Sequence, residues 1–482
     1  MRLYYLAINL TSKEAYHSLV QHLPFAPTKG QEGFLYKLSE FLTDEDKGKV
    51  FLLRGYAGTG KTSMVTSVVS TLKTMRRKYA LLAPTGRAAK VLAGYSRQRA
   101  FTIHKFIYQL MTDEFGNVKF VLRLNTGKKA VIIVDEASMI ATRTESTGRI
   151  QSRDLFADLM QFLDSGTDCK LILIGDNAQL PPVGMDKSPA LEAAFLKTKG
   201  GFEPEMQHEL REVVRQEADS GILENATALR DLLFSDSSDF RLKTSFDDIT
   251  CVSIEDLEDA LNDAYSIYGE ENVMVVTRSN KRANQFNQQI RQRIRMMEEE
   301  IDAGDFLMVV RNNYFWLPKK SSAGFIANGD LVEVQRIGNI EEKHGFRFAD
   351  ATVRMLDYPD DAPIDVKLML TTLNVESPSL SAEDSEKLYL SVSQEHDYLQ
   401  TPSEQAKAVG EDPYLHALQV KFGYAVTCHK AQGGQWPAVF VDQGYLTPEM
   451  MGTEYIRWLY TAITRASEQL YLVGFNPDFL SK

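Results

Sequence analysis

The sequence predicts an α/β protein that contains two parallel sheets. Short apolar runs alternate with helical stretches, which is typical of parallel strands covered on both faces. These runs are KVFLL (49–53), YALLA (79–83), AVIIV (130–134), KLILI (170–174), VMVV (273–276), AVFV (438–441) and LYLVG (470–474). They form two groups separated by a long middle section, so we expect two α/β domains rather than one.

Composition restricts the class of protein only broadly. The 482 residues are 44% hydrophobic and 25% charged, which fits an ordinary soluble globular chain. The net charge of −11 argues against a nucleic-acid coat protein but is compatible with a local basic groove. The three cysteines have no metal-like spacing, and no run reaches the ~18 apolar residues of a membrane span. We therefore expect a cytoplasmic protein with no membrane partner.

Two segments interrupt the α/β alternation. Residues 108–129 predict a β-hairpin insertion with DEFGN (113–117) as its turn. Residues 336–420 predict a small β module, in which TVRMLDY and DVKLMLTTL are interpreted as strands. SPSLSAEDSEK and QTPSEQAKAVGEDP are interpreted as polar, turn-rich connections.

The stretch GYAGTGKTS (55–63) lies between the first apolar run and a helical stretch, which is the context of a P-loop. Glycines allow backbone N–H groups to approach phosphate oxygens, and the helix N-terminus adds positive potential. Lys61 would reach the β- and γ-phosphates, and the Thr62 hydroxyl would ligate Mg²⁺. The pattern therefore predicts ATP and Mg²⁺ as cofactors. The expected nucleotide contacts here are Gly55, Ala57, Gly58, Thr59, Gly60, Lys61, Thr62 and Ser63.

Carboxylates follow two later strands. VIIVDEASM (131–139) would place Asp135 beside the metal and Glu136 where it orients or deprotonates the attacking water. This pair indicates NTP hydrolysis rather than transfer to an acceptor. LILIGDNAQLPPVG (171–184) would bring Asp176 and Gln179 to the same sheet edge. The Gln179 amide suits contact with a γ-phosphate or water, although an Asx-type turn before the Pro-Pro corner also explains this spacing.

Eight segments in order resemble the RecD/Dda-like DNA helicases of superfamily 1, the 5′-to-3′ class. They are GYAGTGKTS, LLAPTGRAAKVL, TIHKF, VIIVDEASM, IGDNAQLPPV, VVRQ, YAVTCHKAQGGQW and YTAITRA. The resemblance implies two RecA-like P-loop domains with parallel sheets and ATP in the cleft between them. It assigns 1–107 and 130–195 to the first domain, and 196–335 and 421–482 to the second. It also implies that 108–129 is a pin-like hairpin and that 336–420 is an SH3-like β insertion.

The resemblance adds nucleotide contacts outside the P-loop. Gln31 would read adenine, and Gln432 and Gly433 would face the γ-phosphate. Arg465 would be the arginine finger and Arg215 a second γ-phosphate arginine, a role that suits arginine because its fork grips phosphate. Two alternatives stay open: Gln31 as a solvent-exposed helix residue, and Arg215 as a salt-bridge partner in a charged helix.

The resemblance also implies contacts with a nucleic-acid strand, because small hydroxyls and cations suit phosphate and sugar. The expected residues are Thr85, Arg87, His104, Lys105, Pro182, Thr427, His429 and Lys430. Arg278, Asn280 and Arg291 are further candidates, with the polar face of an amphipathic helix as the alternative. Phe106 and Trp436 could stack on bases, although ordinary core positions are favoured for both. Phe115, at the hairpin turn, could stack against an opening base pair.

These features together predict an ATP-dependent helicase that acts as a monomer, translocates 5′ to 3′ on single-stranded DNA and unwinds tailed duplex DNA. An RNA or RNA/DNA-hybrid helicase is one alternative, because 2′-OH contacts cannot be read from the sequence. A nucleic-acid-gated ATPase switch without unwinding is another. The 424–474 motifs contradict a small-molecule kinase, which needs no second RecA-like half.

Overall fold

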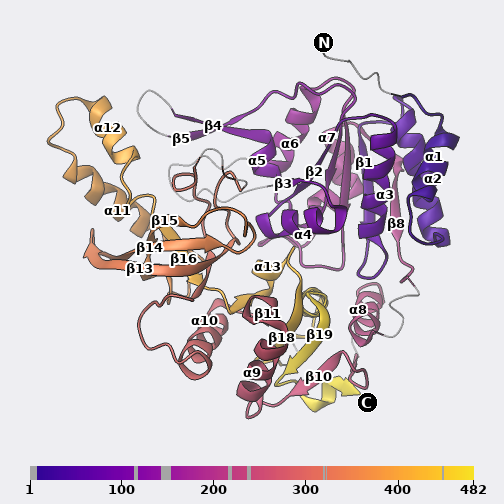
Figure 1. Ribbon diagram of the computed structural model, residues 1–482. Coiled ribbons are helices and arrows are strands. Elements are labelled where there is room, and N and C mark those ends of the chain that lie inside the picture. The colour runs from indigo at the N-terminus through magenta and orange to yellow at the C-terminus, as the bar shows by residue number, and fades with distance from the viewer. Residues whose placement is uncertain are drawn as a thin grey trace.

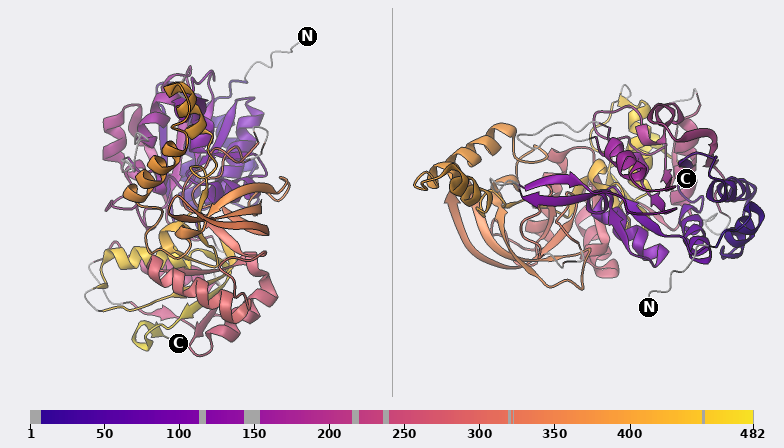
Figure 2. Two further views of the ribbon diagram at one scale, coloured as in Figure 1. Left: turned by 90° about the vertical axis from the view of Figure 1, so that its left-hand side faces the viewer. Right: turned by 90° about the horizontal axis from the view of Figure 1, so that it is seen from above.

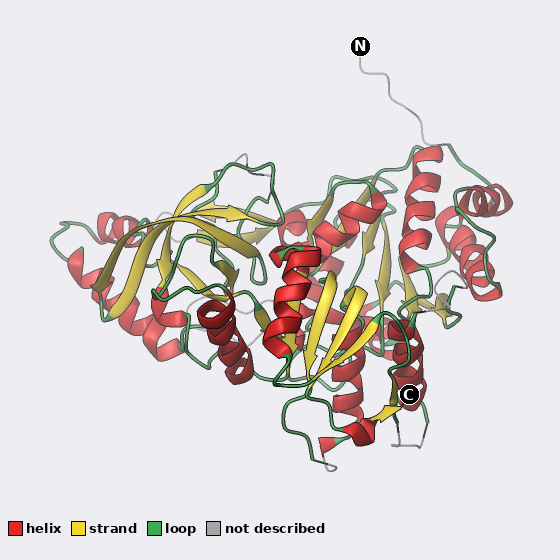
Figure 3. Cartoon of the chain, turned by 60° about the horizontal axis from the view of Figure 1, so that its bottom comes forward, coloured by secondary structure: helices red, strands yellow, loops and turns green. Residues whose placement is uncertain are grey.

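The computed structural model contains two parallel sheets, a closed barrel and a hairpin, which confirms the predicted fold class (Figure 1). It describes residues 8–112, 118–142, 154–214, 220–235, 240–318, 321, 323–447 and 450–481. Helices flank the strands of both sheets, as expected for RecA-like domains (Figure 3). Among the helices that the structure describes, none combines the length and apolarity that a membrane crossing requires.

The first sheet has six parallel strands in the order β3-β2-β6-β7-β1-β8. The strands are β1 (Val50–Gly55), β2 (Tyr79–Ala83), β3 (Ala100–Thr102), β6 (Val131–Val134), β7 (Lys170–Gly175) and β8 (Phe202–Leu210). The helices of this domain are α1 (Ser12–Gln21), α2 (Lys29–Thr43), α3 (Lys61–Thr74), α4 (Gly86–Ser96), α5 (Ile103–Ile107), α6 (Leu155–Asp164) and α7 (Ala193–Lys199). Because β8 pairs with β1, the first sheet extends beyond residue 195, where the sequence interpretation ended it.

The second sheet has five parallel strands in the order β10-β19-β18-β11-β17. The strands are β10 (Ile249–Val252), β11 (Val273–Thr277), β17 (Ala425–Thr427), β18 (Trp436–Asp442) and β19 (Ala466–Val473). Its helices are α8 (Gly221–Leu232), α9 (Leu257–Tyr268), α10 (Asn280–Gln289), α13 (Cys428–Ala431) and α14 (Thr453–Ile463). A short pair, β9 (Leu242–Lys243) with β20 (Leu480–Ser481), joins the C-terminal end to this domain.

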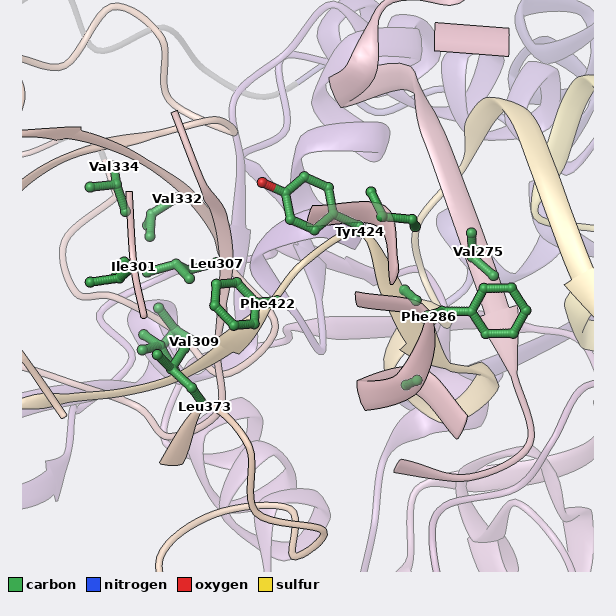
Figure 4. Close-up of a cluster of buried hydrophobic side chains, with 14 of the residues drawn as sticks. Val275, Phe286, Ile301, Leu307, Val309, Val332, Val334, Leu373, Phe422 and Tyr424 are labelled. Atoms are coloured by element: carbon green, nitrogen blue, oxygen red, sulfur yellow. The ribbon is translucent and has the colours of Figure 1, made fainter. Parts of the chain in front are cut away.

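The small β module is a closed barrel and is wider than predicted. It consists of β12 (Phe306–Val309), β13 (Leu331–Lys343), β14 (Phe346–Met355), β15 (Ile364–Met369) and β16 (Leu418–Phe422), so it begins before residue 336 and ends after 420. One hydrophobic cluster runs from the barrel interior into the second domain, as Leu307, Phe422, Tyr424 and Val275 illustrate (Figure 4). The barrel is therefore built onto the second domain through a continuous apolar core.

The segments interpreted as polar connections within this module are helices. They form α11 (Ala382–Glu395) and α12 (Pro402–Gly410). The Ser381 side chain accepts from the Asp384 N–H, and the Thr401 side chain accepts from the Glu404 N–H. These are N-caps, and Pro402 at the first helical position strengthens the second start. The turn-rich interpretation was wrong because it weighed polar composition above these capping patterns.

The hairpin insertion comprises β4 (Tyr108–Thr112) and β5 (Val118–Leu122), which pair antiparallel. It projects from the first domain on the side of the barrel (Figures 1 and 2). The turn at 113–117 and its Phe115 lie outside the described residues. The pin role of this hairpin stays a prediction.

Candidate nucleotide and nucleic-acid site

The P-loop joins β1 to α3, and its glycines meet a conformational requirement. Gly58 and Gly60 have φ of 71° and 80°, in the left-handed region that favours glycine. A Cβ on Gly60 would lie 2.8 Å from Nε2 of Gln31, so a larger residue would displace its neighbour. Nζ of Lys61 lies within the loop, where it donates to the carbonyls of Gly55 and Tyr56 at 2.7 Å each.

Gln31 is buried beside this loop at the start of α2. Its Nε2 donates to the carbonyl of Thr59 at 3.1 Å, and its Oε1 accepts from the N–H of Thr28. The alternative of a solvent-exposed helix glutamine is therefore wrong, since Gln31 is 1% exposed. Adenine reading by Gln31 stays a prediction.

Acidic side chains gather at the carboxyl ends of β6 and β7. Glu136 has φ of 53°, an uncommon backbone conformation for a non-glycine residue and one found at strained functional sites. Burial, with Asp135 adding to it, raises the pKa of Glu136, while Arg465 and Lys61 lower it. Burial likewise raises the pKa of Asp176, opposed by Lys61 and Arg465. Two cations from distant parts of the chain therefore act on the same pair of carboxylates.

Arg465 is held in place by the second domain. Its guanidinium donates to the carbonyl oxygens of Thr461 and Gly434 at 3.0 Å, and to Oγ1 of Thr464 at 3.2 Å. The side chain follows α14 and is buried. The predicted finger is thus held by the second domain, and its charge lowers the pKa of Glu136 and Asp176 in the first domain.

Tyr460 bridges the same boundary with one hydroxyl. Its Oη accepts from the N–H of Ala57 in the P-loop at 2.9 Å and donates to Oδ2 of Asp176 at 2.6 Å. The sequence interpretation missed this residue, although it lies within the quoted segment YTAITRA. The motif indicated an arginine but gave no signal for the tyrosine.

Further hydrogen bonds connect the second domain to residues 177–180 of the first domain. The backbone N–H of Leu180 donates to Oγ1 of Thr461 at 2.8 Å, and its carbonyl oxygen accepts from Nε2 of Gln432 at 2.7 Å. Nη1 of Arg457 donates to the carbonyls of Asn177 at 2.8 Å and Gln179 at 3.3 Å. The Oε1 atom of Gln179 is buried and has no hydrogen-bond partner among the described residues. We call these contacts, together with the Tyr460 bridge, the cleft contact.

Arg215 and Gly433 were also predicted to contact the nucleotide. Arg215 lies outside the described residues, although the neighbouring Val214 donates to the carbonyl of Gly58 at 3.0 Å. Gly433 has φ of 74°, and a Cβ there would meet Cβ of Ala88 at 2.8 Å and Oγ1 of Thr85 at 3.3 Å. Gly433 thus lies against the start of α4.

The start of α4 carries Thr85 and Arg87, two of the residues predicted to contact the strand. The barrel contacts the same end of the helix. Thr85 caps the helix by accepting from the Ala88 N–H. Nη1 of Arg87 lies 2.8 Å from Oδ1 of Asp357, and Nζ of Lys90 lies 3.3 Å from the same atom. The Asp357 side chain follows β14 of the barrel and is fully buried. We call this the α4–barrel contact.

In the second domain, three predicted strand contacts come together. Asn280, Thr427 and Lys430 line one small pocket beside the start of α10. Burial lowers the pKa of Lys430 to about 8 and also lowers that of His429. Arg278 lies over the rings of Tyr455 and Trp458, with its Cζ 5.3 Å and 5.8 Å from their centroids.

Burial affects two of the residues predicted to contact the strand. Burial lowers the pKa of His104 to about 4, so it is neutral at physiological pH. Arg291 is 7% exposed, and its Nε and Nη2 each donate to Asp305 at 2.8 Å. Amphipathic spacing did not reveal that α10 and the turn after it direct Arg291 into the interior. Lys105 is partly buried, which lowers its pKa.

Three residues predicted to lie near bases are buried or packed against other side chains. Pro182 is buried, and the adjacent Val183 is 79% exposed. Trp436 is buried in the second domain, and the Phe106 ring packs edge-on against Phe162 at 5.6 Å. The favoured interpretation of both aromatic residues as core positions therefore agrees with the structure.

The residues present fit a nucleotide with Mg²⁺. Thr62 lies in the first turn of α3, and Asp135 directly follows β6. A hydroxyl and a carboxylate are oxygen ligands of the kind that Mg²⁺ prefers. The buried Oε1 of Gln179 provides a further acceptor at this edge.

Fold and site together define a P-loop protein with two RecA-like domains. The family model for an AAA domain matches residues 38–236, and that for a UvrD-like helicase C-terminal domain matches 422–473. The chain belongs to the superfamily 1 helicases related to RecD and Dda.

Individual relatives align over nearly the whole chain. The ATP-dependent DNA helicase dda of Enterobacteria phage T4 is 26% identical and covers 88% of this chain and 91% of its own. An uncharacterized protein of Acanthamoeba polyphaga mimivirus is 23% identical over 90% of this chain and 97% of its own. A crystal structure of Pif1 helicase from Bacteroides with ADP-AlF3 and single-stranded DNA aligns with a TM-score of 0.49 at 14% identity, covering 92% and 93%.

Proposed function

We propose that this chain is an ATP-dependent DNA helicase that translocates 5′ to 3′ along single-stranded DNA. The observation that carries the proposal is the hydroxyl of Tyr460, which the second domain places between Ala57 of the P-loop and Asp176, near Lys61 and Arg465. Because these two cations come from different domains, hydrolysis requires the domains to be closed on each other. A cycle of closing and reopening can move a strand that both domains bind.

Each domain supplies its own part of the chemistry. Lys61 and the P-loop N–H groups bind the phosphates, and Thr62 and Asp135 would hold Mg²⁺. When bound, Mg²⁺ neutralises charge on the phosphate oxygens. Glu136 orients the attacking water, and Arg465 stabilises charge on the γ-phosphate. The strand contacts are Thr85 and Arg87 in the first domain, and Thr427 and Lys430 in the second.

Similarity to the phage helicase dda supports DNA as the substrate and ATP as the nucleotide that is hydrolysed. The test is strand displacement on partial duplexes with either a 5′ or a 3′ tail, made of DNA or of RNA. We expect opening of the 5′-tailed DNA only, and loss of opening in Lys61→Ala. Opening of only the 3′-tailed duplex would overturn the polarity, and a preference for RNA tails would overturn the substrate. ATP hydrolysis that depends on the strand but opens no duplex would identify a switch.

A further inference from the structure

Helix α4 has a predicted function at each of its ends. Its N-terminal end carries Thr85 and Arg87, which are proposed to contact the strand. Near its C-terminal end, the hydroxyl of Tyr95 donates a hydrogen bond to Oδ2 of Asp135. Asp135 is the carboxylate proposed to hold Mg²⁺. A single helix therefore connects the strand-binding surface to the metal-binding carboxylate.

Both carboxylate oxygens of Asp135 have a fixed partner. Oδ1 accepts from the N–H of Glu136 at 2.9 Å, and Oδ2 accepts from Tyr95. The Tyr95 ring packs against the hydrophobic core that α3 and α4 share with the first sheet. A packed helix moves as a unit, so a shift of α4 at its N-terminal end would also move the Tyr95 hydroxyl.

We propose that Tyr95 is a positioning residue that orients the Asp135 carboxylate for Mg²⁺ and couples strand binding on α4 to that orientation. The coupling rests on the proposed function, because it requires a strand at Thr85 and Arg87. Hydrogen-bond partners of metal ligands typically change metal affinity by about 10-fold to 100-fold. One buried hydroxyl on one ligand belongs at the lower end of that range.

The test removes only the hydroxyl, with Tyr95→Phe. Mn²⁺ binding in the presence of ADP, followed by electron paramagnetic resonance, measures the metal site without hydrolysis. We expect Mn²⁺ to bind about tenfold more weakly. We also expect a smaller stimulation of ATP hydrolysis by an oligo-dT strand, while affinity for that strand is unchanged.

Tyr79→Phe is the matched control. Its hydroxyl donates to Oε1 of Gln98 at 3.0 Å, in the same part of the first domain but away from Asp135. This variant should bind Mn²⁺ and respond to oligo-dT like the unmodified protein. A melting temperature for both variants checks that each is folded.

Two results would overturn the inference. Unchanged Mn²⁺ affinity in folded Tyr95→Phe would show that the hydroxyl does not position Asp135. Weaker Mn²⁺ binding with undiminished stimulation by oligo-dT would show that α4 does not couple the two sites. If the unmodified protein is not stimulated by any strand, the proposed function fails, and the Mn²⁺ titration still tests the positioning role.

Discussion

Two of the contacts between the first domain and the rest of the molecule differ in their chemistry. In the cleft contact, the hydroxyls of Tyr460 and Thr461 and the amide of Gln432 mostly meet backbone atoms of the P-loop and residues 177–180. In the α4–barrel contact, Arg87 and Lys90 meet the buried carboxylate of Asp357. One contact is made mainly of directional hydrogen bonds and the other of opposite charges.

This difference indicates what each contact can respond to. Hydrogen bonds weaken steeply with distance and angle, so the cleft contact depends on how closely the domains approach. An ion pair acts over longer distances, is screened by salt, and can be exchanged for another anion such as a DNA phosphate. We therefore expect the cleft contact to follow the nucleotide and the α4–barrel contact to follow the strand.

The largest effect is expected from Arg465→Ala, which removes the charge that the second domain delivers to the cleft. Strand-stimulated kcat should fall by about 10³-fold, the lower end of what an arginine finger contributes. Steady-state ATP hydrolysis with saturating oligo-dT measures it. Arg465→Lys, which keeps the charge but loses the fork, should recover only part of the rate. Normal turnover in a folded Arg465→Ala would show that the charge acts elsewhere.

Tyr460→Phe tests the hydrogen bonds of the cleft contact separately from its charges, because it removes two hydrogen bonds and no charge. At about 1 kcal/mol for each bond, kcat should fall about 30-fold. KM for ATP and affinity for oligo-dT should change little. The matched control is Tyr455→Phe in the same helix, where Oη accepts from Nε2 of Gln443 at 3.5 Å within the second domain. Equal losses in both variants would show that the effect is general destabilisation of α14.

The sequence predicted those site residues whose position depends on one short segment of the chain. Lys61 follows a glycine pattern, and Asp135 and Asp176 each end an apolar run, so local residues place them at the edge of a parallel sheet. Tyr460 and Arg457 could not be assigned in this way, because their partners lie in another domain and depend on how the domains dock.

The same dependence on distant residues explains why the predicted boundaries of the barrel were wrong. Strands β12 and β16 pair although about a hundred residues separate them, so no local pattern marks Phe306 as the start of the barrel. Asp357 has no motif of its own, and its role appears only when α4 lies beside it. By contrast, Ser381 and Thr401 did signal helix starts, and those could have been read from the sequence.

Asp357→Asn tests the ionic contact by freeing Arg87 and Lys90 for a phosphate. Oligo-dT should bind about threefold more tightly at low salt, and the gain should disappear at high salt. Fluorescence anisotropy at several salt concentrations measures it. Asp365→Asn, at an exposed barrel carboxylate, is the control, since its side chain is 82% exposed. Weaker binding in Asp357→Asn would mean that the ion pair helps to hold the strand site in shape.

The smallest effect concerns Asp330, the second barrel carboxylate at the start of α4. Its Oδ2 accepts from the N–H of Ala327 at 2.7 Å, while its Oδ1 is buried, without a partner among the described residues. A Cβ on Gly86 would lie 2.2 Å from that oxygen. Burial raises the pKa of Asp330 to about 8.

The sign of the pH dependence follows from these values. An unfolded aspartate loses its proton near pH ~4, whereas folded Asp330 keeps it until about 8, so folding stability falls as pH rises through this window and levels off above it. Asp330→Asn does not titrate, so its melting temperature should fall less between pH 5 and 8.5 and should exceed that of the unmodified protein at pH 8.5. Parallel melting curves would contradict this. If they diverge as expected, the α4–barrel contact has a salt-dependent part at Asp357 and a pH-dependent part at Asp330.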